Sequence, residues 1–230
     1  MIVLLLSGWA MSAEESFNTS ARSQKAVARV KPGLEKRLAK LGVAWGSPVF
    51  LRLFKEDHTL ELWVQKEKMY VMFHTYKICY FSGELGPKLK EGDQQAPEGF
   101  YAVRPKLMNP WSSYHLSFNI GYPNRYDRYH GRTGSLIMIH GNCVSIGCYA
   151  MTDKQIDEIY ALVEAALKGG QSQVPTHIFP FRLEGENLAR IKGRKWTDFW
   201  NNLKTGYDWF EKKRCPPRVG MSNGRYSFLD

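Results

Sequence analysis

The sequence predicts a β-rich α+β domain, arranged as a curved mixed sandwich or a partly open barrel. Three features indicate this class: short apolar and aromatic runs bounded by turn residues, one amphipathic helix late in the domain, and an aromatic helical region after it. The chain has 230 residues, enough for one domain of ordinary size with extensions. Hydrophobic residues make up 43% and charged residues 23%, a balance that favours a globular chain over a disordered one.

The strand-like runs all fall within residues 47–182, which we take as the main domain. Each run is rich in β-branched and aromatic residues and is bounded by polar turns or by Gly and Pro. The runs lie at residues 48–54, 59–64, 69–80, 100–103, 135–140 and 174–182. Because only short polar turns separate the first three, they predict an antiparallel meander.

The main helix is predicted to begin after Thr152. Thr152 is a good N-cap, and Gln155 stands three residues later, as in a capping box. Apolar residues then recur at helical spacing until Gly169, which ends the pattern. Between the strands, the long aromatic stretch 105–129 is too irregular for either element, and a loop of that length is usually functional or disordered.

Three segments flank the domain. Residues 1–13 carry a short apolar run followed by small residues, which is typical of a signal peptide cut after Ala10 or Ala13 and predicts export to the periplasm. The alternative is a buried first helix. Residues 14–46 predict a linker, over 16–29, and a short helix, over 32–41. Residues 183–230 predict a C-terminal extension that is helical over 196–210.

The formal net charge of +10 favours polyanionic partners such as a cell-wall polymer, an anionic lipid or a nucleic acid. Lys and Arg are dispersed along the chain and form no nucleic-acid-binding motif, so we do not expect a nucleic acid partner. The sequence carries no signal for an oligomeric state.

The chemistry is concentrated in IHGNCVSIGCYAM, residues 139–151. His140 ends a predicted strand, and Cys148 follows eight residues later on a small-residue turn ahead of the helix. A nearby His, or a helix N-terminus, activates a thiol as a nucleophile. Gly147 allows close approach of the backbone, so the N–H groups of Gly147 and Cys148 could form an oxyanion hole. The Gly141 carbonyl, or another backbone carbonyl, could orient the His140 ring.

Four cysteines are present, and an even number in an exported chain suggests disulfides. If Cys148 stays free for chemistry, spacing alone leaves the pairing among Cys79, Cys143 and Cys215 open. We favour a disulfide with Cys79, or a free thiol, over a nucleophilic role for Cys143. A zinc site made of His140, Cys143 and Cys148 matches no usual ligand spacing, so we expect neither metal nor cofactor.

The order IHG, then S-x-G-C followed by an aromatic residue, closely resembles the YkuD-type L,D-transpeptidase catalytic domain. The segment from Ala96 to Tyr101 also resembles that family's T-P-x-G-x-F/Y pattern. The resemblance implies a cysteine enzyme acting on peptidoglycan stem peptides. It assigns the general base to His140, the nucleophile to Cys148, and the turn that supplies oxyanion donors to Ser145 and Gly147.

Two departures from the family pattern point to a subgroup. Only seven residues separate His140 from Cys148, and Ile146 stands where many members have His or Lys. With the long 119–130 loop and the aromatic extension, the chain resembles the exported murein–lipoprotein amidases. This implies hydrolysis of the bond between meso-diaminopimelate and a lipoprotein lysine. The alternatives are a crosslinking L,D-transpeptidase and a non-catalytic peptidoglycan-binding protein.

Other residues have weaker signals. Arg125 and Tyr126 could meet substrate carboxylates, because Arg forms bidentate pairs with them, and His130 could line the pocket. The aromatic residues of the extension could stack on sugars, but their spacing of three and four favours the buried face of a helix. These aromatic residues are Trp196, Phe199, Trp200, Tyr207, Trp209 and Phe210.

Overall fold

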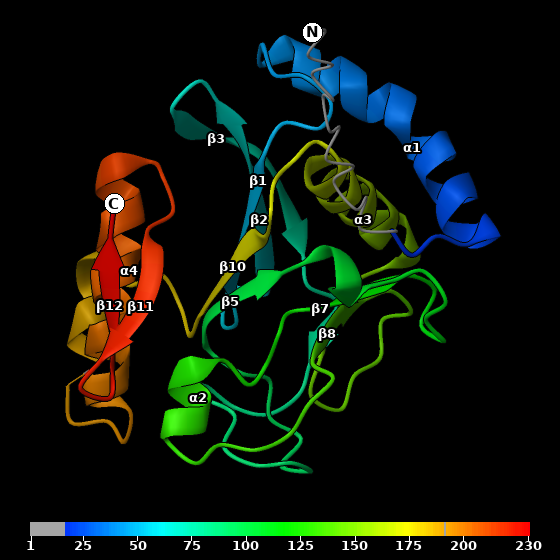
Figure 1. Cartoon of the computed structure of the whole chain (residues 1–230). Coiled ribbons are helices and arrows are strands. Elements are labelled where there is room, and N and C mark those ends of the chain that lie inside the picture. The colour runs from blue at the N-terminus through cyan, green and yellow to red at the C-terminus, as the bar shows by residue number, and fades with distance from the viewer. Residues whose placement is uncertain (1–16, 191) are drawn as a thin grey trace, which may run out of the picture.

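A computed structural model describes residues 17–190 and 192–230 (Figure 1). Two five-stranded sheets share one core. The first, in spatial order, contains β3 (Met69–Lys77), β2 (Thr59–Lys66), β1 (Val49–Phe54), β10 (Val174–Phe179) and β5 (Gly99–Val103). The second contains β4 (Tyr80–Phe81), β9 (Tyr149–Ala150), β8 (Met138–His140), β7 (Ser117–Asn119) and β6 (Met108–Asn109). The predicted signal segment, residues 1–13, lies outside the described residues.

Both sheets are mixed, as predicted, and neither closes into a barrel. In the first sheet β1 pairs in parallel with β10, and in the second β8 pairs in parallel with β9. The other pairings are antiparallel, including the predicted meander of β1, β2 and β3. Short helical segments complete the loops: η1 (Pro105–Leu107), α2 (Arg125–Tyr129) and η2 (Gly185–Arg190).

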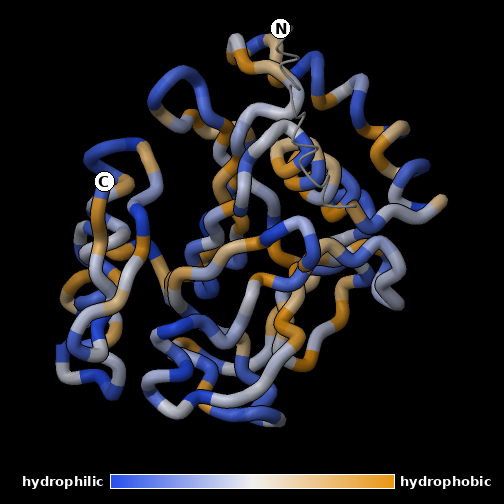
Figure 2. Tube along the Cα trace, viewed as in Figure 1, coloured by the Kyte–Doolittle hydropathy of each residue, from blue (hydrophilic) through white to orange (hydrophobic). Residues whose placement is uncertain are grey.

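The helix α3 (Asp153–Lys168) fills the space between the sheets. Thr152 caps it and Gln155 completes the capping box, as the sequence predicts. Ile156, Ile159 and Val163 are fully buried in the cluster that also contains Leu51 of the first sheet and Ile139 of the second. Figure 2 shows hydrophobic segments along the central strands and α3, whereas the loops around α2 are mostly hydrophilic.

The prediction of a linker over residues 16–29 is wrong, because one helix, α1, spans Ala21–Lys40. Pro32 lies inside it rather than at its first turn. Burial outweighs the hydrogen bond lost at Pro32: Ala26, Leu34 and Leu38 are buried in the main core, where α1 lies against α3. Polar composition suggested a linker, but it only reflects the face of α1 that contacts solvent.

The C-terminal extension contains α4 (Thr197–Lys213), as predicted, and then a hairpin that we did not predict. The hairpin pairs β11 (Arg218–Ser222) with β12 (Arg225–Leu229). Asn223 and Gly224 form its turn, and both have positive φ, as a two-residue hairpin turn requires. The extension packs through aromatic side chains. The prediction that they form the buried face of a helix is confirmed for four of them, which are all buried: Phe199, Trp200, Tyr207 and Phe210.

A buried ion pair of the main domain accepts a hydrogen bond from the extension. The side chains of Lys55 and Glu98 are both fully buried, with Nζ and Oε1 3.2 Å apart. Glu98 also accepts hydrogen bonds from the Gly86 N–H at 2.6 Å and from the Trp200 indole N–H of α4 at 2.7 Å. Burial lowers the pKa of Lys55, and the charge of Glu98 opposes that effect. Lys55 also donates to the carbonyl groups of Gly86 and Ala96.

We expect Glu98→Ala to lower the free energy of unfolding by about 3–5 kcal/mol, because it leaves a buried lysine without its counter-charge. Urea denaturation followed by tryptophan fluorescence measures this loss. The matched control is Asp208→Ala, which breaks the more exposed pair with Lys204 and should cost about 0.3–0.5 kcal/mol. A loss below about 1 kcal/mol for Glu98→Ala would contradict a structural role for this pair.

Candidate active site

The structure places the two residues that the sequence singles out, His140 and Cys148, beside two neighbouring parallel strands. They lie at the two ends of the segment that joins β8 to β9, residues 140–148, here called the His–Cys turn. The register pairs His140 with Ala150, and the backbone N–H of Met138 donates to the Cys148 Sγ at 3.3 Å. Cys148 directly precedes β9, so its sulfur lies against the backbone of β8, the strand that ends at His140.

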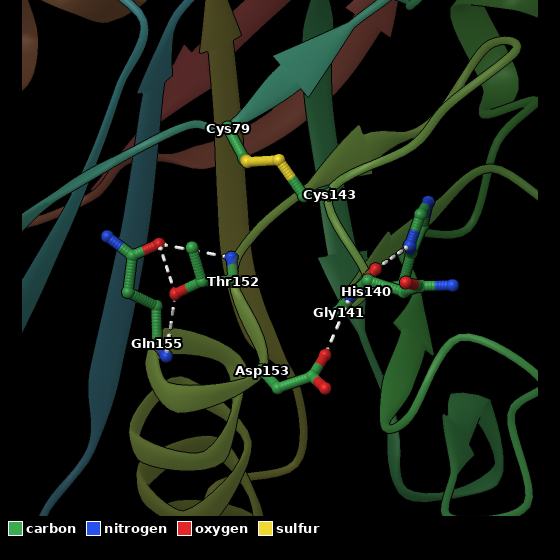
Figure 3. Close-up of a disulfide and its surroundings, with 8 residues drawn as sticks. Cys79, His140, Gly141, Cys143, Thr152, Asp153 and Gln155 are labelled. Carbon is green, nitrogen blue, oxygen red and sulfur yellow. Dashed lines mark hydrogen bonds between the residues drawn. A yellow bond between two sulfur atoms is a disulfide. The ribbon is translucent and has the colours of Figure 1, made fainter.

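His140 is held in the tautomer that a general base needs. Its Nδ1 lies 2.6 Å from the Gly141 carbonyl oxygen (Figure 3). A carbonyl only accepts hydrogen bonds, so Nδ1 carries the proton and Nε2 keeps a lone pair. Burial lowers the pKa of His140, and the hydrogen bond to Gly141 opposes this only in part. The ring is therefore neutral at pH 7 and can accept a proton at Nε2.

Cys148 rests as a neutral thiol. Burial raises its pKa, while the Met138 N–H and the positive charge of Lys88 act in the opposite direction. The thiol donates to the Leu136 carbonyl oxygen, at 3.7 Å. Both side chains are thus neutral at pH 7, a thiol and an imidazole rather than a thiolate and an imidazolium. A nucleophilic Cys148 would need a base to take its proton during attack.

Ser145 orders the turn that carries the nucleophile. Its hydroxyl accepts hydrogen bonds from the N–H groups of Cys148, at 2.7 Å, and Gly147, at 3.2 Å, and donates to the Cys148 carbonyl at 2.8 Å. Gly147 has φ +145°, a conformation that only glycine adopts without strain. The oxyanion role of these N–H groups stays a prediction, since both donate to Ser145 in this arrangement.

The first half of the His–Cys turn is anchored on two sides (Figure 3). Cys143 forms a disulfide with Cys79, which confirms the favoured pairing, and Cys148 and Cys215 are free. On the other side, Asp153 at the start of α3 accepts a hydrogen bond from the Asn142 N–H at 2.8 Å. A Cβ on Gly141 would lie 2.6 Å from that carboxylate, so this approach requires glycine.

Sequence reasoning missed Tyr114, whose ring lies against His140 with centroids 4.8 Å apart. The Tyr114 carbonyl also accepts a hydrogen bond from the Gly141 N–H at 3.0 Å. Arg22 of α1 fixes this loop, because its guanidinium donates to the carbonyl oxygens of Ser112 and His115, each at 2.8 Å. The length of the stretch 105–129 predicts a functional or a disordered loop, but nothing in its sequence distinguishes Tyr114.

The three candidate substrate-binding residues lie on or beside α2, and two of them, Tyr126 and His130, contact the C-terminal hairpin. Tyr126 is buried and stacks on Tyr226 at 4.3 Å. The His130 Nε2 lies 2.8 Å from the Gly224 carbonyl oxygen, and Arg125 is exposed. None of them contacts the His–Cys turn in the described structure, and their substrate role stays a prediction.

The zinc alternative is excluded for the set that the sequence suggested, because the disulfide removes Cys143 as a ligand. Within residues 17–190 and 192–230, no group of three or more His, Cys, Asp or Glu side chains is arranged to hold a metal ion.

The neutral resting pair makes a prediction about thiol reactivity. In a Cys215→Ser variant, the rate at which iodoacetamide modifies Cys148 should keep rising past pH 9, because burial raises the pKa of this thiol. Mass spectrometry of samples quenched between pH 5 and pH 10 measures the rate. A rate that levels off below pH 7, and that falls in His140→Ala, would instead indicate a preformed thiolate–imidazolium pair.

Comparison with known proteins agrees with this geometry. Residues 51–175 match the YkuD family, described as the L,D-transpeptidase catalytic domain. YafK of Escherichia coli (strain K12), whose name places it among the L,D-transpeptidases, is 51% identical over 181 residues, covering 79% of this chain and 74% of YafK. The sequence from Escherichia coli O157:H7 matches equally well.

Among solved structures, the helical cell shape determining protein Pgp2 from Campylobacter jejuni aligns with a TM-score of 0.46 and 18% identity, covering 83% of this chain and 80% of that one. Bd1075 from Bdellovibrio bacteriovorus aligns with a TM-score of 0.43 and 19% identity, covering 77% and 78%. From the family match and the 51% identity, the chain belongs to the YkuD family of L,D-transpeptidases and is a peptidoglycan-directed cysteine enzyme of that family.

Proposed function

We propose that this chain hydrolyses the amide bond between meso-diaminopimelate of a peptidoglycan stem peptide and a lysine amine of an attached lipoprotein. The observation that carries this proposal is that a neutral, oriented His140 ends β8 and a free Cys148 directly precedes its parallel neighbour β9. The short His–Cys turn favours water over an amine as acceptor, because a shortened loop offers fewer residues to bind a second stem peptide.

The first step forms a thioester. The Cys148 Sγ attacks the carbonyl carbon at the L-centre of diaminopimelate, and the thiol proton moves to the His140 Nε2. The carbon–nitrogen bond then breaks, and the lysine amine leaves with that proton. His140 returns to its neutral state, still oriented by the Gly141 carbonyl.

The second step releases the stem peptide. A water molecule attacks the thioester carbon while the His140 Nε2 takes one of its protons. The carbon–sulfur bond breaks, and the proton returns to the Cys148 sulfur. The products are a free carboxylate on diaminopimelate and the original thiol. An amine in place of water would make the same intermediate into a crosslink, which is the transpeptidase alternative.

We place this reaction in the periplasm, as the signal-like segment at residues 1–13 predicts. The disulfide between Cys79 and Cys143 supports export, because such bonds persist in oxidising compartments and are rare in the cytosol. Within the described residues, no helix is both long and apolar enough to cross a bilayer.

The first test is incubation with muropeptides that carry a diaminopimelate-linked lysine peptide, read by mass spectrometry. We expect the native chain to release the lysine peptide. Cys148→Ala and His140→Ala should lower the rate by at least about a thousandfold, since nucleophile and base act as a unit. Cys215→Ser, which changes the other free thiol, is the matched control and should keep full activity.

Other results of this test would redirect the assignment. New crosslinked dimers in place of a released peptide would identify a transpeptidase. Equal release by Cys148→Ala would exclude the thioester mechanism. No reaction with either sample would favour the non-catalytic binding protein.

The contact between Tyr114 and His140 predicts that Arg22 acts at a distance on the general base. Arg22→Ala should lower kcat by roughly ten- to hundredfold with little change in KM, because the loop that supports the His140 ring would shift. The acid limb of the kcat/KM profile should move as well, and Tyr114→Phe should retain activity where Tyr114→Ala does not.

The control for this prediction is Lys25→Ala, an exposed charge on the same helix. If Arg22→Ala changes thermal stability but leaves kcat and the pH profile intact, then Arg22 only holds the loop to the domain and does not position the base.

A further inference from the structure

A groove is lined by residues of the C-terminal hairpin, of β5 and of α2. Figure 1 shows where these three elements lie in the fold. The volume of the groove is about 780 Å³. Phe100, Tyr126, Pro217 and Met221 contribute to its lining, which is partly apolar. No residue of the His–Cys turn lines it.

The groove has a strongly positive lining. The cationic side chains in it come from three parts of the chain, and no Asp or Glu is among the described residues that line it. They are Arg104, Lys106, Arg125, Arg128 and Arg218. All five are exposed at the surface. Such a concentration of one sign raises the local concentration of anions.

None of these five cations has a carboxylate partner within the described residues. Arg104 donates to the Gln173 side-chain oxygen at 3.3 Å and Arg128 to the Pro123 carbonyl. By contrast, the groove between α1 and α3 neutralises its charges internally, since Arg37 pairs with Glu158 at 2.8 Å. The groove at the hairpin is therefore free to bind an external anion.

The backbone beside the groove indicates the shape of that anion. Strand β11, whose residues 218–221 line the groove, pairs along one edge only, with β12. A free strand edge presents N–H and C=O groups to an extended peptide, and the guanidinium groups nearby match its carboxylates in bidentate geometry. A phosphate headgroup would use the charges but not the strand edge.

We propose that this groove binds an extended, carboxylate-bearing peptide, namely a second peptidoglycan stem peptide beside the one being cleaved. The choice of a peptidoglycan peptide rests on the proposed function. The inference that the ligand is an extended peptide with carboxylates rests only on the charge of the groove and on the free strand edge. The groove would hold the enzyme on the polymer while the His–Cys turn acts on an attached protein.

The test measures binding and not turnover. A muropeptide with a free-carboxylate tetrapeptide is titrated into Cys148→Ala by isothermal calorimetry, and we expect two sites. The groove variant combines Arg104→Gln, Arg128→Gln and Arg218→Gln in that background. It should lose one site or weaken it by at least about tenfold, since each exposed ion pair contributes modestly. Amidation of the peptide carboxylates should have the same effect.

The matched control removes three unpaired, exposed charges from α1, by Lys25→Gln, Lys36→Gln and Lys40→Gln. It has the same net charge as the groove variant and should bind like Cys148→Ala. A single site in every sample, or equal loss in the control, would overturn the proposal. Equal binding of the amidated peptide would also overturn it.

Two further measurements are needed. The first distinguishes a phosphate ligand from a peptide carboxylate, and the second distinguishes the groove proposal from the amidase proposal. Full displacement of the muropeptide from the groove by inositol hexakisphosphate, or by vesicles of phosphatidylglycerol, would identify the groove as a phosphate-binding site. That result would overturn the proposal of a peptide ligand. Lysine-peptide release by the native chain is measured separately. Two-site binding without release of the lysine peptide would contradict the amidase proposal but support the groove proposal. Release of the lysine peptide with a single binding site would support the amidase proposal and contradict the groove proposal.

Discussion

The active site depends on one topological constraint: parallel strands β8 and β9 are neighbours, yet only residues 141–148 join them. Parallel neighbours usually need a connection of a dozen or more residues, often containing a helix. Here the chain must return along β8 within eight residues, which it can do because both strands are very short. The return uses positive φ at Asn142, Cys143 and Gly147. It leaves His140 at the end of one strand and Cys148 at the start of the next.

The family match covers residues 51–175, but the surroundings of the site extend beyond it on both sides. Before it, α1 fixes the loop that carries Tyr114, through Arg22. After it, α4 contributes Trp200, which bonds Glu98 of the segment that leads into β5. The same segment also contacts the residue that follows Cys148, because the Tyr149 hydroxyl donates to the Pro97 carbonyl at 2.6 Å. The extensions are thus part of the architecture that holds the site.

Sequence reasoning succeeded where the signal is local. The meander, the cap at Thr152 and the His–Cys spacing are all encoded within a few residues, and the structure has each of them. It failed where contacts between residues far apart in the sequence determine the structure. Residues 16–29 were expected to form a linker, but most of them belong to α1, which packs on α3, and Tyr114 contacts His140 only after folding. The hairpin turn at Asn223 and Gly224 is different, since its Asn-Gly signal is present in the sequence and was overlooked.

The neutral state of the Cys148 thiol also helps to explain why Cys148 stays free while Cys79 and Cys143 form a disulfide. Thiolate is the form that oxidants and disulfides attack, so burial that raises the pKa of Cys148 slows such side reactions at neutral pH. Cys143, the nearest cysteine in sequence, is already committed to Cys79 and cannot resolve an oxidised Cys148. In the proposed mechanism, reactivity then depends on His140, which takes the proton as a substrate carbonyl is attacked. The burial that protects the Cys148 thiol would therefore also make it depend on a base.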